Sequence, residues 1–454
     1  MTRRPAVTVS ALVLSAPADI LRELYDAAVA GADPREATRR AVARLRRSAS
    51  RTWVIALGKA APAMAVGAVE ALAALGREPA GGVVIGADRA PPPHPALETL
   101  AGDHPLPGAR SLAAAARLGE VAARVAPADA VLVLLSGGAS ALAGAAVDGV
   151  EPGELAALHA ALLSSGADVA AVNAVRKRFS RWGAGRLAAA LAPAHVDCLV
   201  VSDVVGDDLA TIGSGPCVAD PSSAASLVAW LRGAALWESV PPSMRAELDA
   251  VVRGTRPETP KPGDAALRHV TTRVVLGNRH ALRAAAERAA ALGVETLGVR
   301  GEMRGEAALR GERIASRLTE SRGFSRRRRG YGCFFWGGET TVSLRDAPPD
   351  ALGGRCQELA LAASRVLYAL GDAGRGVALL AAGTDGRDGP TDAAGAIVDG
   401  DTWPVARAAG RNPARDLAAH DSYRALDAAG ALLKTGLTGT NVTDVVIGLV
   451  TNQE

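Results

Sequence analysis

The chain of 454 residues is too long for one compact core, so its length predicts two domains of about 150–250 residues each. Hydrophobic residues make up 49% and charged residues 22% of the chain, a balance typical of globular proteins with sizeable cores. Lysine and arginine number 51 against 47 acidic residues, and a formal net charge of +4 excludes a nucleic-acid binder that works mainly through its net field.

The first half of the chain alternates short apolar runs with alanine-rich helical sequence. A helical pattern covers 19–45, and strands are expected at 52–57, 82–86, 130–135 and 196–201. Strand, turn and helix repeated in this way predict a parallel sheet with helices on both faces. We therefore expect an α/β fold whose N-terminal domain, residues 18–240, is a doubly wound, mostly parallel, Rossmann-like sheet that binds nucleotide or phosphate.

Prolines interrupt the pattern after residue 240, and we expect a Pro-rich linker at 241–264. The strand–helix pattern then resumes, with strands expected at 272–276, 294–299, 332–336, 377–382 and 442–450. The second α/β domain is accordingly expected to cover 265–454. Two such domains would enclose an interdomain cleft.

The turn after the first predicted strand contains Lys59 between Gly58 and Ala60. A lysine at a helix N-terminus opposes the helix dipole, whereas a bound anion would favour it. Arginine fills the ordinary cationic role in this chain, because the only lysines are Lys59, Lys177, Lys261 and Lys434. Lys59 is therefore predicted to bind phosphate, with a plain surface lysine as the alternative. Lys261 falls in the predicted linker, where the sequence offers no reason for it.

A glycine-rich loop, Ser136-Gly137-Gly138-Ala139-Ser140, follows the most apolar predicted strand. Two glycines allow the backbone to approach a ligand closely and to point its amides inward. A tight strand–helix turn also uses glycine, and that is the plainer interpretation. The loop matches neither the Walker A pattern nor the GxGxxG dinucleotide fingerprint, and neither occurs elsewhere in the chain.

Three carboxylates, Asp203, Asp207 and Asp208, follow the strand at 196–201. Such carboxylates repel one another unless a cation neutralises them. Magnesium is usually held by one or two carboxylates together with phosphates and water, so Asp203 and Asp207 are predicted to bind Mg²⁺. Capping of the following turn is the alternative for Asp207 and Asp208.

Two helical segments place further cations where a ligand could reach them. Helical spacing puts Asn173 and Lys177 on one face, which would either line a cleft or face solvent. Arg355 follows two glycines at a predicted helix start. As for Lys59, the helix dipole opposes a cation there unless an anion is bound. Two cations aimed at one cleft are what phosphoryl transfer needs to hold the charge on the moving group.

The cysteines are widely scattered and have no CxxC pair, so a zinc site or disulfide framework is not expected and a cytoplasmic location is. No apolar run reaches the roughly 18 residues of a membrane helix. The apolar stretch from Ala6 to Ala16 is short and interrupted by polar residues, so we expect a loose leader rather than a signal peptide.

Taken in order, these motifs resemble those of the type II glycerate kinases, whose C-terminal half is the MOFRL domain. The resemblance runs from about Leu21 to Val450, with the MOFRL region at about 332–450. The segments that carry it are GKA at 58–60, HPLP at 104–107, SGG at 136–138, NAVRK at 173–177, SDV at 202–204, GGETT at 337–341, GGR at 353–355, GTDG at 383–386 and TGLTGTN at 435–441.

The resemblance implies an ATP-dependent kinase that phosphorylates D-glycerate, usually at the 2-hydroxyl, with Mg²⁺. It implies catalytic roles for Lys59, Asp203 and Arg355, where Asp203 either holds Mg²⁺ or accepts the hydroxyl proton. Residues expected to contact nucleotide or substrate are Ser136, Gly137, Gly138, Ser140, Asn173, Lys177, Glu339, Asp385 and Asn441. The implied partners are glycerate and ATP, with no nucleic acid and no membrane, while monomer and homodimer both stay open.

The chain departs from the family pattern at Ala139, where a third glycine is usual, at Gly213, where alanine is common, and at Cys356, where asparagine is usual. These departures bear on substrate preference and rate. Two rival functions stay in view. Family members have been labelled hydroxypyruvate reductases, against which the missing GxGxxG fingerprint argues, and a non-catalytic hydroxy-acid-binding module is the other rival.

Overall fold

The computed structural model describes residues 16–45, 51–151, 153–154, 157–158, 161–162, 169–321, 330–345 and 347–452. The chain forms two compact units. The N-terminal unit contains Ala32–Asn278 together with Gly439–Val442, and the C-terminal unit contains the chain up to Gly31, Arg279–Thr438 and the residues from Thr443 onward.

A six-stranded sheet forms the centre of the N-terminal unit, in the order β3-β2-β1-β4-β5-β6. All neighbouring strands are parallel. The strands are β1 (Thr52–Leu57), β2 (Pro79–Gly86), β3 (Leu97–Ala101), β4 (Ala130–Leu135), β5 (His195–Val201) and β6 (Val270–Leu276). Every residue of β1 is buried, as expected for a central strand covered on both faces. The doubly wound α/β prediction is confirmed.

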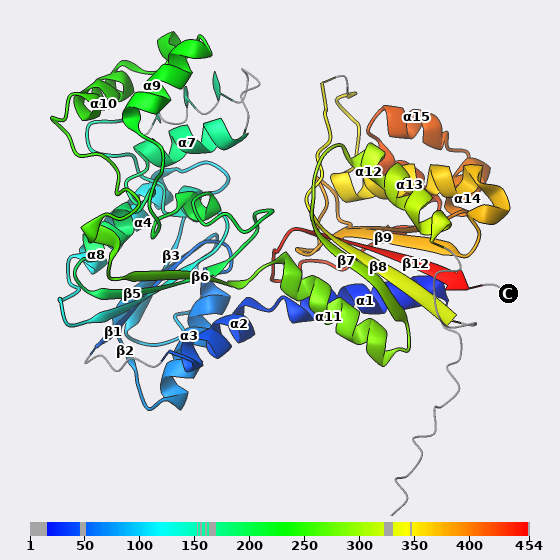
Figure 1. Cartoon of the computed structure of the whole chain (residues 1–454), viewed down its shortest axis with the longest axis horizontal. Coiled ribbons are helices and arrows are strands. Elements are labelled where there is room, and N and C mark those ends of the chain that lie inside the picture. Colours follow the sequence, from blue (N-terminus) through cyan, green and yellow to red (C-terminus); the bar gives the residue numbers. More distant parts are fainter. Residues whose placement is uncertain are drawn as a thin grey trace, which may run out of the picture. The chain divides into compact units, whose positions relative to one another are not determined.

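Helices surround this sheet, and a smaller helical layer lies beyond one end of it (Figure 1). They are α2 (Pro34–Ala43), α3 (Ala61–Ala74), α4 (Ala109–Ala122), α5 (Ala139–Leu142), α7 (Val169–Phe179), α8 (Arg186–Leu191), α9 (Ala224–Gly233) and α10 (Pro242–Val252), with short 3₁₀ turns at Ile212–Ser214, Trp237–Ser239 and Ala265–Leu267. The layer formed by α7, α9 and α10 has its own apolar core around Phe179, Leu231 and Leu248.

The C-terminal unit is built on a second sheet, in the order β11-β10-β9-β12-β8-β7. Only β7 and β8 pair in parallel, and the other described pairs are antiparallel. The strands are β7 (Glu295–Met303), β8 (Gly330–Gly338), β9 (Val377–Gly383), β10 (Gly395–Asp399), β11 (Leu432–Leu433) and β12 (Asp444–Asn452). The sequence did not predict β3, β10 or β11.

Helices cover both faces of the second sheet. Figure 1 shows α12 and α13 on one face and α1 and α11 on the other. The helices of this unit are α1 (Pro17–Gly31), α11 (Asn278–Ala291), α12 (Ala307–Glu320), α13 (Arg355–Ala369), α14 (Thr402–Ala408), α15 (Pro413–Ala418) and α16 (Ser422–Ala428), with a 3₁₀ turn at Gly371–Ala373.

The two units divide the chain differently from the boundaries expected at 240 and 265. The strand β6 pairs with β5 and completes the first sheet, although the sequence placed it in the second domain. The helix α1 belongs to the C-terminal unit, where the Tyr25 hydroxyl donates to the carbonyl of Gly383 at 2.7 Å. The stretch expected as a linker contains α10, which begins at Pro242, a position where proline costs no helical hydrogen bond. Long-range packing decides each of these points.

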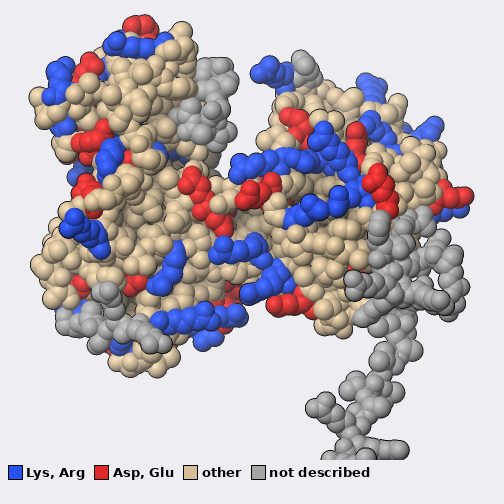
Figure 2. Space-filling view, in the orientation of Figure 1, with Lys and Arg blue, Asp and Glu red and all other residues tan. Residues whose placement is uncertain are grey.

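Charge is unevenly distributed on the surface, although the net charge is small. In Figure 2 acidic and basic side chains are interspersed, and basic ones gather over β7 and α12. There Arg300, Arg310, Arg313 and Arg317 line a cavity of about 250 Å³ together with Trp336. No helix among the described residues combines the length and apolar character needed to cross a membrane.

Candidate active site

The Lys59 turn joins β1 to α3 and lies against the loop that follows β4. Gly58 has a φ of +119°, and a side chain there would collide with Ser136. The amide of Lys59 donates to the carbonyl of Gly137 at 2.9 Å, and the amide of Ala60 donates to Oγ of Ser136 at 3.0 Å. Ser136, predicted to contact nucleotide, thus uses its buried hydroxyl to connect the two loops.

These two loops occupy a special position in the first sheet. Successive strands extend from β1 toward β3 on one side and from β4 toward β6 on the other, so the strand order reverses between β1 and β4. In open α/β sheets, ligands bind at such a switch point, outside the carboxyl ends of the strands. The Lys59 turn and the glycine-rich loop leave these two carboxyl ends.

Asp203 comes to the same place from the end of β5. Its carboxylate contacts Gly137 so closely that any side chain at position 137 would overlap it. Burial raises the pKa of Asp203, while its own backbone amide and the charge of Lys59 act in the opposite direction. The structure therefore brings Lys59, Gly137 and Asp203 together from three different strand ends.

His104 is a member of this group that the sequence did not assign. A Cβ at Gly138 would lie 3.2 Å from Cγ of Lys59 and 3.3 Å from Cδ2 of His104. Burial and the Lys59 charge lower the pKa of His104, which favours the neutral imidazole. Its only sequence signal is the HPLP segment at 104–107. We call Lys59, His104, Gly137, Gly138 and Asp203 the Lys59 cluster.

Lys59 itself is exposed. Among the described residues, no carboxylate lies within ion-pair distance of its ammonium group. A cation that is held at the switch point without a protein counter-ion is suited to bind an anion.

The other two carboxylates after β5 have separate local surroundings. Asp207 has a φ of +55° and lies beside Gly277, where a Cβ would be 2.8 Å from its Oδ1. Asp208 accepts hydrogen bonds from the Ala210 amide at 3.1 Å and the Thr211 hydroxyl at 2.6 Å, as the capping alternative predicted. The described residues contain no group of three potential metal ligands. Asp203 offers carboxylate oxygens beside the glycine-rich loop, and these suit an ion whose remaining ligands are phosphates and water.

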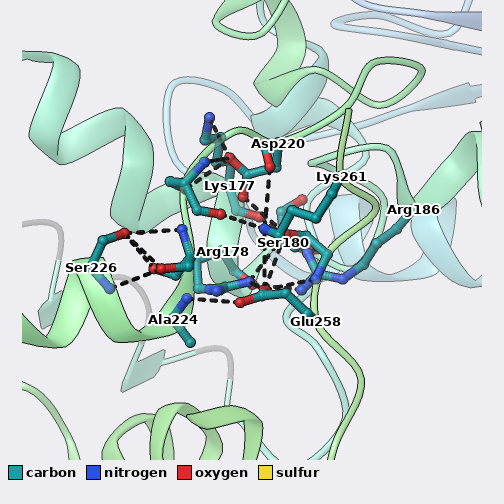
Figure 3. Close-up of polar contacts among 12 residues, drawn as sticks. Lys177, Arg178, Ser180, Arg186, Asp220, Ala224, Ser226, Glu258 and Lys261 are labelled. Atoms are coloured by element: carbon teal, nitrogen blue, oxygen red, sulfur yellow. Dashed lines mark hydrogen bonds and ion pairs between the residues drawn. The ribbon is translucent and has the colours of Figure 1, made fainter. Parts of the chain in front are cut away.

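Lys177, predicted to bind substrate, takes part in a buried polar network between α7 and the chain near Glu258 (Figure 3). Its ammonium lies 2.9 Å from Oδ1 of the fully buried Asp220. The neighbouring Arg178 pairs with Glu258. Such pairing favours a role for Lys177 in joining α7 to this segment. Asn173, also on α7, is half-buried.

Lys261 belongs to the same network, a structural role that the sequence did not indicate. Its ammonium donates to the hydroxyl of Thr259 at 2.7 Å and to the carbonyl of Asp220 at 3.2 Å, and it also contacts the carbonyl of Ser222. The compact ammonium serves several acceptors around one point, which the planar guanidinium of arginine does not.

Arg355 begins α13 in the C-terminal unit and is surrounded by carboxylates. Its guanidinium donates to Asp444 twice, from Nε at 2.6 Å and from Nη2 at 2.9 Å. Its Nη1 lies 2.9 Å from Oε1 of Glu339. Asp444 is buried, whereas Arg355 and Glu339 remain about 35% and 41% exposed. This bidentate geometry orients the guanidinium strongly.

The carboxyl group of Asp388 lies at the N-terminus of α13. Its carboxylate accepts from the amides of Cys356 at 3.2 Å and Gln357 at 2.8 Å, and the absence of a side chain at Gly354 makes room for it. Burial is the largest influence on Asp388 and raises its pKa to about 7. Neither Asp388 nor Asp444 was assigned from the sequence, although Asp388 lies two residues after the GTDG segment.

Two further predicted residues, Asp385 and Asn441, fall in different units. Asp385 follows β9, and its Oδ1 accepts from the Arg387 amide at 3.1 Å. Asn441 is half-buried in the short segment that packs with the N-terminal unit, next to Val442, whose carbonyl accepts from Nδ2 of Asn278 at 2.9 Å.

Comparison with known proteins covers nearly the whole chain. Residues 20–249 match a domain of unknown function, DUF4147, and residues 332–444 match the MOFRL family. The D-glycerate 2-kinase of Thermotoga maritima is 37% identical over 88% of this chain and 91% of its own length. The chain belongs to the MOFRL-containing glycerate kinase family.

Two further comparisons describe the range of this family. A crystal structure of glycerate kinase from Thermotoga maritima matches with a TM-score of 0.83 and 34% identity, covering 95% of this chain and 99% of that one. An Agrobacterium vitis protein that bears the provisional name hydroxypyruvate reductase is 37% identical over 94% of this chain and 93% of its own length. Kinase and reductase names therefore occur side by side among relatives of this chain.

Two departures from the glycerate kinase pattern face each other in the fold. A Cβ at Gly213 would lie 3.2 Å from the Cβ of Ala139 and 2.8 Å from Cδ1 of Leu135. The methyl group of Ala139 therefore lies beside the place where an alanine at position 213 would have its own methyl group. The third departure, Cys356, is buried in the core of the C-terminal unit, where its thiol lies beside the carboxyl groups of Asp444 and Asp388.

Proposed function

We propose that this protein is an ATP-dependent kinase that transfers the γ-phosphoryl group of ATP to the 2-hydroxyl of D-glycerate. The observation that carries the proposal is the Lys59 cluster, which presents an unpaired ammonium, two glycines and a buried carboxylate at the switch point of a parallel sheet. Membership of the glycerate kinase family supports the reaction and the substrate.

Lys59 is proposed to neutralise the charge of the transferring phosphoryl group. Phosphoryl transfer leaves little covalent chemistry to the protein, so catalysis consists mainly of positioning and electrostatic stabilisation. An exposed ammonium at the end of a buried strand can meet the γ-phosphate without breaking an ion pair of its own. The backbone at Gly137 and Gly138 would approach the phosphates closely because neither residue has a side chain in the way.

Asp203 is proposed either to accept the proton of the glycerate hydroxyl or to hold Mg²⁺. Its burial favours the protonated acid and makes the carboxylate a better base than an exposed aspartate. Mg²⁺ bound with ATP would neutralise phosphate charge, and carboxylate oxygens such as those of Asp203 are among its usual ligands. Asp207 is proposed as a second ligand. The two roles of Asp203 differ in their metal dependence, so a Mg²⁺ titration of Asp203→Asn tests them.

Arg355, Glu339 and Asp385 of the C-terminal unit are proposed to contact the substrates. The same is proposed for Asn441, which belongs to the N-terminal unit. Asp444 holds the guanidinium of Arg355 in one orientation, and the exposed part of that side chain is free to contact a phosphate oxygen. Because two carboxylates already compensate its charge, Arg355 should contribute more to orientation than to net neutralisation.

A coupled ADP-release assay over D-glycerate, L-glycerate and related hydroxy acids tests the proposal, with phosphorus NMR of the product to identify the phosphorylated oxygen. We expect rapid ADP release with D-glycerate and a 2-phosphoglycerate product. ADP release with none of these acids would overturn the proposal.

The two rival functions predict different readouts in the same preparation. Oxidation of NADH or NADPH with hydroxypyruvate, followed at the nicotinamide absorbance, would indicate a reductase. A hydroxy-acid-dependent rise in melting temperature without ADP release would indicate a binding module. Neither outcome is expected, because the chain lacks the GxGxxG fingerprint and keeps the Lys59 cluster intact.

We also propose a cytoplasmic location. All four cysteines lie in described segments, and each is buried with a free thiol. Cys217 even contacts Cys198, yet the two are not joined. Free thiols in such positions are typical of a reducing compartment.

A further inference from the structure

Arg176 lies on α7 at the wall of a small pocket in the N-terminal unit. The pocket has a volume of about 30 Å³, and Ser140, Arg176, Ser180 and the prolines 105 and 107 contribute to its lining. The Ser180 hydroxyl oxygen accepts from the Gly183 amide at 3.1 Å, so its own proton remains available to another acceptor. The pocket thus combines one guanidinium with two hydroxyl groups.

Arg176 differs from the two basic residues that follow it. Lys177 pairs with Asp220 and Arg178 with Glu258. For Arg176 no described carboxylate lies within ion-pair distance, and its buried Nε has no hydrogen-bond partner. Burial alone lowers its pKa, with no acidic group acting against it. A guanidinium nevertheless stays protonated in proteins, so this charge, which has no counter-ion among the residues that the structure describes, is suited to bind an anion.

The pocket adjoins the Lys59 cluster at two points of the chain. His104 belongs to the cluster and the next residue, Pro105, lines the pocket. Gly138 contacts Lys59, and Ser140, two residues later, lines the pocket. A ligand whose one end occupies the pocket would therefore extend toward Lys59 and Asp203.

We propose that Arg176 binds the carboxylate of the hydroxy-acid substrate, assisted by the hydroxyl groups of Ser140 and Ser180. The inference rests on the proposed function, because it identifies the anchor for the acid end of the molecule whose hydroxyl is phosphorylated. In a 2-hydroxy acid the reacting hydroxyl sits on the carbon next to the carboxylate, which agrees with an anion pocket that adjoins the Lys59 cluster. A pocket of about 30 Å³ suits a group of carboxylate size and is too small for a triphosphate chain.

The first test compares Michaelis constants of Arg176→Gln with those of the wild type. We expect the KM for D-glycerate to rise about 10- to 100-fold, as for the loss of a charge-assisted hydrogen-bonded pair, and the KM for ATP to change less than twofold. Arg176→Lys keeps the charge without the forked geometry, so its KM for D-glycerate should lie between those of the wild type and Arg176→Gln. Arg253→Gln, an exposed arginine on the same unit, is the matched control and should leave both constants unchanged. An equal rise in both constants, or a rise for ATP alone, would overturn the proposal.

The second test removes the carboxylate from the substrate instead of the arginine from the protein. Glyceramide keeps both hydroxyls but carries no negative charge. For the wild type, kcat/KM with glyceramide should be lower than with glycerate by about the factor that Arg176→Gln causes with glycerate. For Arg176→Gln, the change from glycerate to glyceramide should lower kcat/KM little further. Losses that multiply would show that Arg176 and the carboxylate act independently, which contradicts the proposal.

The third test needs no turnover, and it separates the inference from the proposed function. D-glycerate without ATP should raise the melting temperature of the wild type and of Arg253→Gln but not that of Arg176→Gln, while glycerol should have no effect on any of them. If this pattern holds and no ADP is released with any acid, the carboxylate site stands and the kinase proposal fails. If glycerate is phosphorylated and the melting temperature of Arg176→Gln still responds to glycerate, the kinase proposal stands and the carboxylate site fails.

Discussion

Lys59, in the turn before α3, and Arg355, at the first position of α13, carry the same sequence signal, yet their surroundings are opposite. Lys59 follows a buried parallel strand and has no described carboxylate at ion-pair distance. Arg355 donates twice to the buried Asp444 and also contacts Glu339, while Asp388 occupies the helix N-terminus beside it. The helix-dipole argument applied equally to both cations, but of the two it is Lys59 that has no counter-ion among the described residues.

The difference teaches that a cation at a helix start indicates an anion without saying where the anion comes from. For Arg355 the protein supplies it, so the guanidinium is oriented by its own fold. For Lys59 the anion must come from a ligand. The comparison predicts that changes at Lys59 affect catalysis, whereas changes around Arg355 affect stability as well.

The largest expected effect is that of Lys59→Ala. Loss of a positioned cation at the transferring phosphoryl group should lower kcat by about 100- to 1,000-fold. The melting temperature should stay within a few degrees because no described residue pairs with the ammonium group. Steady-state ADP release and thermal unfolding measure the two quantities. Lys434→Ala, which removes an exposed lysine paired with Asp392, is the matched control and should retain full kcat. A kcat for Lys59→Ala within twofold of wild type would remove Lys59 from the mechanism.

Next in size is the effect of Asp444→Asn. This change leaves Arg355 without its buried bidentate partner and should lower the free energy of unfolding by about 2–3 kcal/mol, measured by urea denaturation. Glu339→Gln provides the control, because Glu339 is 41% exposed and its pair with Arg355 should be worth less than about 1 kcal/mol. Equal losses in the two variants would show that burial does not distinguish the two contacts.

A smaller effect should appear in the pH dependence of stability through Asp388. Its pKa is raised from 3.8 to about 7, mainly by burial, so between these values the folded state holds a proton that the unfolded state has lost. Unfolding then releases a proton, and the contribution of Asp388 to stability falls as the pH rises from about 4 to about 7. The difference in unfolding free energy between wild type and Asp388→Asn should follow this fall and level off above pH 7. A difference that grows with pH would mean that the pKa of Asp388 is lowered instead.

The smallest effect concerns the loop that supports Lys59. Gly213→Ala should lower the free energy of unfolding by about 1–2 kcal/mol, because position 213 has a φ of +56° and the new methyl group would crowd Ala139 and Leu135. Adding Ala139→Gly should recover about 0.5 kcal/mol by removing one of these contacts, while the strain of the positive φ stays. A double-mutant cycle in urea measures the coupling, and strict additivity would mean that the two positions do not touch.

Much of the fold was predictable because its signals are local. The run TWVIAL at 52–57 is apolar throughout, which is typical of a parallel strand covered on both faces, and β1 has these same bounds. Sequence reasoning also selected Lys59, Gly137, Gly138 and Asp203, which the structure brings together. It missed β3, β10 and β11, which are only 5, 5 and 2 residues long. It assigned β6 to the other domain because the pairing of β6 with β5 spans a long stretch of chain and leaves no local pattern.

The partners of charged side chains were predicted less well. Lys177, which was expected to contact substrate, pairs with Asp220, whereas its neighbour Arg176 was passed over and has no counter-ion among the described residues. Adjacent helical positions point about 100° apart, so one residue can face a buried network while the next faces a pocket. The sequence did not indicate a role for Lys261 because its acceptors, Asp220 and Ser222, lie about 40 positions earlier.

The sequence by itself determined the alternation of strand, turn and helix, the polar and glycine-rich loops at the strand ends, and the family to which those motifs point. Each of these depends on residues close together in the chain, where hydrophobic periodicity and turn chemistry act directly. Only the tertiary structure decided which charges are already paired. Ion pairs such as Arg355 with Asp444 join residues far apart in the chain, so the difference between a cation held by the protein and one left for a ligand emerges only once the sheets have formed.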